Sequence, residues 1–186
     1  MNAPVPVDLL RQLLSYDPET GELTWRPRSP AMFAGARYSP ARAASAWNSR
    51  FAGKPALNSP DAKGYLNGGI FAHTYLTHRV VWAIHHGEWP EGEIDHINHD
   101  GTDNRIANLR LVTSAENKRN LPARRSNRTG VTGVFFNKQT RKFHAYIKRD
   151  GRRQHLGCFG TKDAATAARK SAERELGFHP NHGAAR

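Results

Sequence analysis

The segment "EIDHINHDGTDNRIANLRLVTSAENKRN", residues 93–120, contains side chains of the types that hydrolysis of a phosphodiester requires. Such hydrolysis needs a base that deprotonates the attacking water, and positive charge at the phosphate and the leaving oxygen. His96 has an ordinary pKa of about 6.5, so at neutral pH it is largely uncharged and can act as that base. Asp95 and the amide oxygen of Asn117 are hard ligands that suit a divalent cation such as Mg²⁺.

Two strands and a helix are expected to position these side chains. Residues 94–97 and 108–112 are predicted to be short strands, joined by the turn sequence "NHDGTDN". The sequence "TSAE" that follows is a capping box, in which Thr113 caps a helix and Glu116 returns a hydrogen bond. Folding the first turn of this helix back over the hairpin would bring Asn117 near the strand.

One point of strand geometry opposes a shared site. Neighbouring residues of a strand point to opposite faces, so Asp95 and His96 serve one phosphate only if the strand twists or ends there. Each polar residue also has a purely structural interpretation, which taken singly is the favoured one. The residues concerned are Asp95 as a turn acceptor, His96 as a half-buried strand residue, Asn104 and Asn108 as turn and strand-entry residues, and Asn117 as a solvated helical position. The ordered combination is what indicates chemistry.

That combination, with "THRVVWAIHHGEWPEGE" before it, resembles the HNH endonucleases, in particular the phage-type homing and nicking enzymes, over about residues 65–120. The motif is Asp-His, an Asn twelve residues after the His, and a further Asn nine residues later. The resemblance implies a ββα-metal (His-Me finger) module in which His96 is the general base, Asp95 and Asn117 hold the metal, and Asn108 braces the loop. Asn117 replaces the final His of the eponymous pattern, which suggests Mg²⁺ or Mn²⁺ rather than Zn²⁺. "YDPETGELTWRPR" resembles the N-terminal portion that these proteins often carry.

The C-terminal part of the chain is predicted to be a second module. Strands are expected near residues 132–137, 142–148 and 153–159, and Asp150-Gly151 is a strong signal for a hairpin between the last two. Thr161 is expected to cap a helix that Gly177 ends. The face expected to pack on the sheet comprises Ala164, Ala168, Ala172 and Leu176. The fold class is therefore α+β, a ββα-metal module followed by a three-stranded antiparallel sheet packed on one helix.

"GVTGV" and "LGCFGTKDAATAA", with the basic strands between them, resemble the DNA-binding domain of plant ethylene-response transcription factors of the Apetala type. The resemblance covers about residues 127–177 and implies that the sheet enters the major groove of double-stranded DNA. The candidate DNA-binding residues in this module are Arg128, Lys138, Arg141, Lys142, Lys148, Arg149, Arg152 and Arg153.

The charge distribution independently favours a nucleic acid partner. The chain has a net charge of +12, and residues 118–153 contain twelve Lys or Arg and a single acid. A basic amphipathic helix with a bulky apolar face, as a membrane surface would require, is not apparent. Four aromatic residues interleave with the cations and are expected to face the core while the charges face phosphate; they are Phe135, Phe136, Phe143 and Tyr146. The alternative is an ordinary solvated basic face.

The sequence also predicts how the chain is divided into domains. The predicted domains are a lead-in (1–64), the HNH module (65–120), a basic linker (121–127), the ethylene-response-factor-like domain (128–178) and a tail (179–186). Within the lead-in, Leu9, Leu10, Leu13 and Leu14 predict a helix, residues 23–25 a strand, and residues 27–62 mostly loop. A further helix is expected from Thr77 to Gly87 with Val80, Val81 and Ile84 inward. His78, His85 and His86 are interpreted as packing or surface residues.

Several classes of protein are disfavoured. The sequence has no apolar run long enough to span a membrane and no secretory signal, so a cytoplasmic location is expected, in the host cell if a phage encodes the chain. Cys158 is the single cysteine, which excludes an intramolecular disulfide and a Cys-rich zinc ribbon. Any metal is therefore expected to be bound by oxygen and imidazole, and no protein partner is evident.

The sequence thus predicts a metal-dependent HNH DNA endonuclease, nicking or cutting both strands, with a C-terminal DNA-binding sheet. Arg105, Arg110 or Arg119 would add positive charge at the phosphate. One alternative is a DNA-binding regulator or architectural protein whose HNH module is inactive. Another is a basic protein that binds RNA or the ribosome, which would prefer RNA to duplex DNA.

Overall fold

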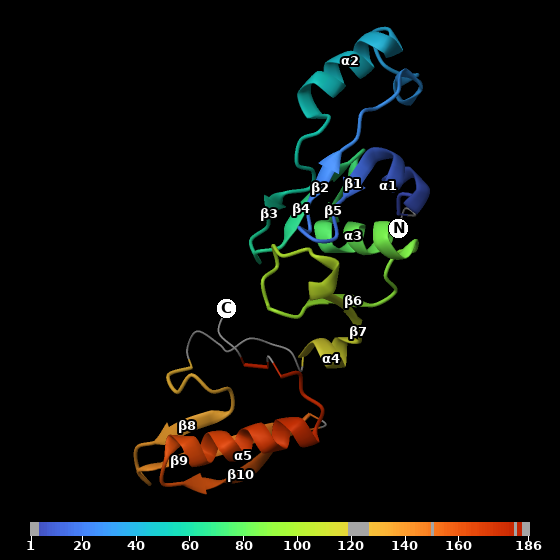
Figure 1. Cartoon of the computed structure of the whole chain (residues 1–186). Helices are drawn as coiled ribbons and strands as arrows, with labels where there is room; N and C mark the ends of the chain where they lie inside the picture. Colours follow the sequence, from blue (N-terminus) through green and yellow to red (C-terminus); the bar gives the residue numbers. More distant parts are fainter. Residues whose placement is uncertain (1–3, 119–126, 150, 181, 184–186) are drawn as a thin grey trace. The chain divides into compact units, whose positions relative to one another are not determined.

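The computed structural model describes residues 4–118, 127–149, 151–180 and 182–183 (Figure 1). The chain divides into two compact units, one of residues 1–96 with 100–111, the other of residues 97–99 with 112–186. Within the described part of the chain, no helix combines the length and the apolar character that crossing a membrane would take.

The first unit carries three small sheets and three α-helices among its described residues. Its sheets have the strand orders β1-β2, β3-β4-β5 and β6-β7, of which β7 ends at the boundary with the second unit. The elements in chain order are α1 (Val7–Leu13), β1 (Leu14–Tyr16), β2 (Leu23–Trp25), a 3₁₀ helix (Pro30–Phe33), α2 (Pro40–Phe51), β3 (Ser59–Pro60), β4 (Leu66–Ile70), β5 (His73–Leu76), α3 (Thr77–His86), β6 (Glu93–His96), a second 3₁₀ helix (Ile106–Asn108) and β7 (Leu109–Val112).

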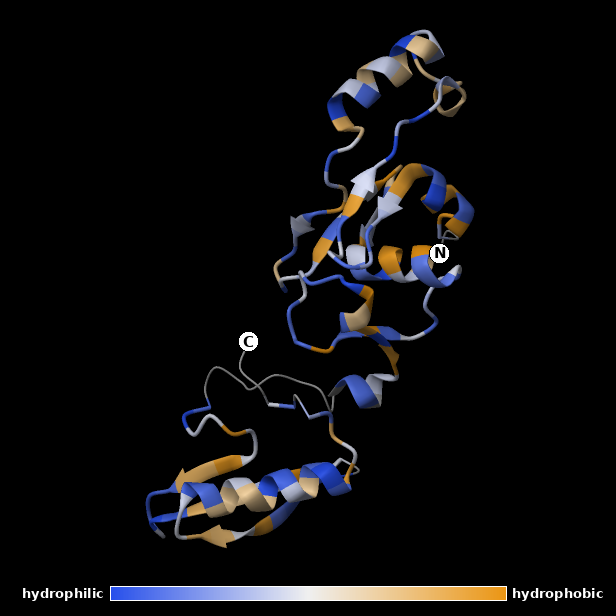
Figure 2. Ribbon diagram, viewed as in Figure 1, coloured by the Kyte–Doolittle hydropathy of each residue, from blue (hydrophilic) through white to orange (hydrophobic). Residues whose placement is uncertain are grey.

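Helices α1 and α3 supply much of the core of the first unit. Leu10 and Leu13 of α1 and Val80 and Val81 of α3 are fully buried in one hydrophobic cluster. Figure 2 shows hydrophobic residues in both helices, alternating with hydrophilic ones. The predicted helix at residues 77–87 is confirmed, and Gly87 ends it with a left-handed φ of 87°. The lead-in and the segment from Tyr65 onward therefore share one core.

Two expectations for the lead-in are wrong. Residues 27–62 were expected to be mostly loop, but they include α2, a helix of 12 residues. Ser39 caps it by accepting from the backbone N–H of Arg42 at 3.4 Å, and Pro40 occupies the first helical position, where its missing N–H costs nothing. Leu14 opens strand β1 and does not extend the first helix.

The second unit contains the predicted sheet and helix. Its elements are α4 (Ser114–Lys118), β8 (Val134–Asn137), β9 (Lys142–Arg149), β10 (Arg152–Phe159) and α5 (Lys162–Glu175). The three strands pair antiparallel in the order β10-β9-β8, and α5 packs on one face of the sheet, as Figure 1 shows. The three-stranded antiparallel sheet on one helix is confirmed.

Helix α5 is rotated relative to the expected packing face. Thr161 caps it as predicted, by accepting from the N–H of Ala164 at 3.2 Å. Ala164 is nevertheless exposed, and the buried face comprises Ala165, Arg169, Ala172 and Glu173. Arg169 reaches this face because its guanidinium is neutralised by Glu173 (Nε to Oε1, 2.8 Å) and also donates to the carbonyl oxygen of Tyr146. Counting small residues alone could not reveal a buried ion pair.

Candidate active site

The candidate active site lies at the end of strand β6. Asp95 and His96 are its last two residues, and their exposures are 8% and 4%. The strand stops at His96, which is one of the two conditions under which neighbouring residues could act on one phosphate. The chain then turns through residues 97–105 before the 3₁₀ helix and β7.

Asn104 orients the His96 ring. The His96 Nε2 lies 3.4 Å from the Asn104 Oδ1, and Asn104 is 1% exposed. The Asn104 Nδ2 donates to the carbonyl oxygen of Thr102 at 3.1 Å, which assigns Oδ1 to the side of the amide that faces the ring. An acceptor at Nε2 favours the tautomer that carries its proton there, so that Nδ1 carries the lone pair.

Burial keeps His96 in its neutral form. Removal from water lowers the pKa of His96 below its ordinary value, partly offset by the hydrogen bond to Asn104 and by the charge of Asp95. The ring of His78 from α3 meets the His96 ring edge-on at 5.1 Å, and Tyr65 packs against both. Burial lowers the pKa of His78 to about 3, so it adds no charge at neutral pH.

Arg110 binds the carboxylate of Asp95. Its Nε and Nη2 donate to the Asp95 Oδ2 at 2.9 and 2.7 Å. Arg105 similarly engages both oxygens of Asp103, at 2.8 and 2.6 Å. These two arginines, expected to face phosphate, are thus paired with carboxylates. A carboxylate oxygen is the donor that Mg²⁺ and Mn²⁺ prefer, so the chemistry of Asp95 fits such an ion.

Asn108 ties together the loop that follows His96. Its Nδ2 donates to the carbonyl oxygen of Asp103 at 2.8 Å, and its backbone N–H donates to that of Arg105 at 2.9 Å. Asn108 is 8% exposed. Contacts of this kind are those expected of a residue that braces the loop.

The N-terminal hairpin supports the same loop from outside. The Tyr16 hydroxyl donates to the carbonyl oxygen of Asn104 at 2.8 Å, and burial raises the pKa of Tyr16 to about 12, so the hydroxyl keeps its proton. Gly21, with a φ of 79°, approaches the loop so closely that an added Cβ would lie 2.5 Å from the backbone nitrogen of Arg105. Glycine is required there by both the conformation and the contact.

The capping box before Asn117 is confirmed. Thr113 accepts from the N–H of Glu116 at 3.3 Å, and the Glu116 carboxylate accepts from the N–H of Thr113 at 2.8 Å. Asn117 lies in α4, within the second unit. The order of strand, loop, strand and helix is that of the expected module, while the joint binding of one ion by Asp95 and Asn117 stays a prediction.

The cations of the C-terminal module lie on the surface. All eight predicted DNA-binding residues there, from Arg128 to Arg153, are exposed. Ala145 of β9 is fully buried beneath α5, so alternation places Lys142 and Lys148 on the opposite face of the sheet, which we call the outer face. Arg153, the strand partner of Lys148, joins them. Arg119 lies outside the described residues.

The expected separation of charges from aromatics is wrong. Phe135 and Phe136 are 38% and 46% exposed, and of the four aromatics only Phe143 packs against the core of this unit. Tyr146 lies on the outer face, where the guanidinium of Arg153 stacks 3.8 Å from its ring centre. Aromatic rings and cations therefore share one surface.

Two residues beside His96, Asn104 and His78, were named in the sequence but given no role in the site. Asn104 follows an Asp in a turn-forming run, where an asparagine is unremarkable, so nothing in its spacing distinguished it. His78 was interpreted as a packing residue, and it does pack, but against His96. Its position three residues before the buried Val81 places both on the inward face of α3, a signal that could have predicted its burial.

Comparison with known protein families identifies the same segment of the chain. A family model described as HNH endonuclease matches residues 75–119, which include Asp95, His96, Asn104, Asn108 and Asn117. The chain thus carries an HNH endonuclease domain, which suggests cleavage of nucleic acid, and HNH nucleases generally use a divalent metal ion.

A particular relative comes from a phage. The chain is 29% identical over 80 residues to "Protein 3.8" of Escherichia phage T7. The match covers 42% of this chain and 66% of the phage protein, just under two thirds of its length. No solved structure shows a significant match to the chain.

Proposed function

We propose that the protein is a metal-dependent HNH endonuclease that hydrolyses phosphodiester bonds of double-stranded DNA. The observation that supports this most directly is the buried His96, kept neutral by its surroundings and oriented by Asn104, directly beside the carboxylate of Asp95. All three residues lie in the segment that the HNH endonuclease model matches.

In the proposed mechanism His96 is the general base. The neutral ring takes a proton from a water molecule, and the resulting hydroxide attacks the scissile phosphorus. The bond from phosphorus to the 3′ oxygen breaks, and that oxygen takes a proton from solvent. The products are a 5′-phosphate and a 3′-hydroxyl. Asn104 and Asn108 act by holding the ring and its loop in position.

Asp95 and Asn117 are proposed to hold Mg²⁺ or Mn²⁺. Such an ion supplies positive charge at the scissile phosphate and at the leaving oxygen. Arg110 already donates to one oxygen of Asp95 and holds that carboxylate in place. Arg105 and Arg119 remain candidates for further phosphate contacts.

The C-terminal sheet is proposed to supply DNA affinity in the manner of the ethylene-response-factor domains. Its outer face presents Lys142, Lys148 and Arg153 to solvent, with Arg128, Lys138, Arg141, Arg149 and Arg152 exposed on the same module. Cations arranged along a sheet bind the phosphate backbone and release counterions. Homing-type site choice would then depend on this module.

The test is cleavage of supercoiled plasmid by the purified full chain in Mg²⁺, in Mn²⁺ and in EDTA, beside His96→Ala. We expect relaxed or linear product that requires metal, and a loss of rate of about 100-fold or more in His96→Ala with DNA binding retained. Open circles as the only product would indicate nicking, whereas linear product would indicate that both strands are cut.

Two results would overturn the proposal. Cleavage by His96→Ala at the wild-type rate would remove His96 as the base. Binding of DNA with no metal-dependent cleavage of plasmid or phage genomic DNA would favour a regulator or architectural protein with an inactive HNH module.

A further inference from the structure

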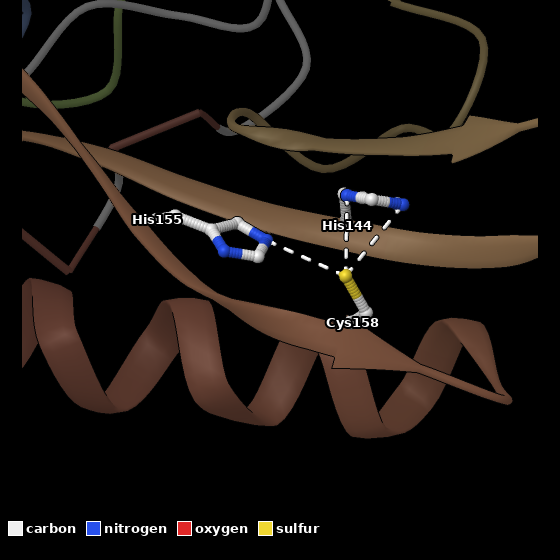
Figure 3. A group of neighbouring side chains, drawn as sticks. All are labelled: His144, His155 and Cys158. Carbon is white, nitrogen blue, oxygen red and sulfur yellow. Dashed lines mark hydrogen bonds between the residues drawn. The ribbon is translucent and has the colours of Figure 1, made fainter. Parts of the chain in front are cut away.

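Three metal-ligating side chains meet on the outer face of the C-terminal sheet (Figure 3). The Cys158 Sγ lies 3.4 Å from the Nδ1 of His144 and 3.6 Å from the Nε2 of His155. The ligand atoms of all three residues lie within 4.8 Å of one another. None of the three belongs to the segment that the HNH endonuclease model matches.

We propose that His144, His155 and Cys158 form a second metal site, and that it binds Zn²⁺. Zinc bonds of about 2.3 Å to sulfur and about 2.0 Å to nitrogen, at tetrahedral angles, separate the sulfur and nitrogen atoms by about 3.6 Å. The two sulfur–nitrogen distances here match that separation. A thiolate with two imidazoles is a softer donor set than Mg²⁺ accepts, which distinguishes this site from the one proposed at Asp95.

An irregularity in strand β10 makes the cluster possible. His155 and Cys158 are three residues apart, so in a regular strand their side chains would point to opposite faces. The register shifts between His155 and Gly157, where a β-bulge places an extra residue. His155 therefore pairs with Tyr146 and Cys158 with His144, and all four residues point to the outer face.

Neighbouring side chains orient both imidazoles. The Nε2 of His144 lies 3.2 Å from the hydroxyl of Thr140, which can accept a hydrogen bond from a proton carried on Nε2; the lone pair is then on Nδ1, the ring nitrogen nearer to Cys158 (3.4 Å against 3.7 Å for Nε2). Metal-binding histidines usually donate their other ring N–H in this way. The His144 ring also stacks on Phe135 at 5.4 Å, and the His155 ring packs on Tyr146 at 4.7 Å.

The bound ion would connect strands β9 and β10 through their side chains and hold the bulge in place. Three protein ligands leave the fourth tetrahedral position of Zn²⁺ open to water. His155 and Cys158 are exposed, so the ion can enter directly from solvent. The sequence predicted oxygen and imidazole ligands only; the thiolate was missed because its partners are brought to it by strand pairing and by the bulge.

The test exploits the single cysteine of the chain. The reduced full-length protein is titrated with Co²⁺, and the charge-transfer absorbance between thiolate and cobalt is recorded, since only a metal bound at Cys158 can produce it. We expect the band to saturate at one equivalent and to disappear when Zn²⁺ is added. Cys158→Ser should abolish it, and His144→Ala or His155→Ala should weaken Co²⁺ binding by at least about 10-fold.

Matched controls exclude the other histidines. The double variant His85→Ala, His86→Ala removes an exposed neighbouring pair on α3, and His96→Ala alters the active site; both should keep the full band. Absence of the band in the wild-type protein would mean that the cluster is only a hydrogen bond between thiol and imidazole. A band unchanged in both His144→Ala and His155→Ala would mean an adventitious thiolate contact. Either result overturns the proposal without bearing on cleavage.

Discussion

At the scale of single residues, the proposed base His96 is surrounded by groups that need not contact DNA. Asn104 is buried and anchored to the carbonyl oxygen of Thr102, so its acceptor oxygen is held at a fixed place beside the ring. His78 and Tyr65 pack against the same ring. Burial lowers the pKa of His96, so the base remains available below the pH at which a free histidine is protonated.

Asn104→Ala should reduce the cleavage rate by about 10- to 100-fold, because a misplaced ring loses its near-attack geometry. Plasmid nicking under single-turnover conditions measures the effect, and Asn58→Ala, an exposed asparagine of the same unit, is the matched control. Asn104→Ala with an unchanged rate and a normal thermal melt would show that Asn104 does not position the base.

Asn104→Asp should separate position from charge. The carboxylate keeps an acceptor beside Nε2 but raises the pKa of His96, since a negative neighbour favours the protonated ring. Because the base acts only when neutral, activity should be lost at a higher pH as the solution is acidified. The rate measured as a function of pH in the variant and the wild type checks this; an acid limb that stays in place would contradict it.

His78 should make the first unit sensitive to acid. Its pKa is about 3 in the folded chain and about 6.5 when unfolded, so between these values the unfolded chain binds the proton that the folded chain excludes. Stability is fully present above about pH 6.5 and should fall by up to about 1.4 kcal/mol per pH unit below it. Urea unfolding at about pH 7 and about pH 5 measures the slope, which His78→Gln should reduce; an equal slope in the variant would refute this role.

At the scale of elements, the C-terminal sheet and α5 meet at a point that only glycine can occupy. Gly133 has a φ of 82°, and a Cβ there would lie 2.4 Å from the carbonyl oxygen of Tyr146 and 2.9 Å from the Nη1 of Arg169. These two groups are hydrogen-bonded to each other, since the buried guanidinium of Arg169 donates to the carbonyl oxygen of Tyr146. The second glycine of "GVTGV" is thus explained by a close approach of the backbone to a buried charge.

Gly133→Ala should destabilise the second unit by about 2 kcal/mol or more, since the clash adds to the strain of a positive φ. Gly130→Ala is the matched control, because Gly130 has a φ of 74° with nothing within 4 Å of its Cβ position. That change should cost only about 1 kcal/mol. Chemical denaturation followed by a signal from the sheet compares the two; equal losses would mean that the contact itself has no effect.

Local sequence signals predicted where helices and strands lie better than they predicted which side of each helix or strand is buried. Strand 23–25, the helix at 77–86 and the capping box at Thr113 all follow from a few neighbouring residues, and all were found. The rotation of α5 and the bulge in β10 depend on tertiary contacts that no window of sequence contains. The hydrogen bond between His96 and Asn104 likewise could not be predicted, because it depends on the path of the loop that joins them. Helix α2 was not predicted, although Ser39 followed by Pro40 is a recognisable signal for the start of a helix.

At the scale of the whole molecule, positive charge is concentrated where the proposed DNA contact would be. Lys148→Ala, on the outer face, should weaken duplex binding and make the logarithmic dependence of affinity on salt shallower by about one. Arg174 is exposed on α5, which covers the opposite face of the sheet, so Arg174→Ala should leave that slope unchanged. Binding isotherms at several salt concentrations measure these slopes. Equal slopes for the two variants would show that the outer face is not the surface that contacts DNA.

The contact between the N-terminal hairpin and the loop after His96 limits how the HNH segment could be transferred to another protein. Tyr16 and Gly21 hold the backbone of residues 104–105, yet they lie more than fifty residues before the segment that the HNH endonuclease model recognises. A fusion protein that contains only residues 75–119 joined to another DNA-binding protein would have the motif but would lack the contacts that Tyr16 and Gly21 make with the loop. Recombination among related genes should therefore preserve activity only when the crossover falls ahead of Tyr16, or when the recipient supplies an equivalent hairpin.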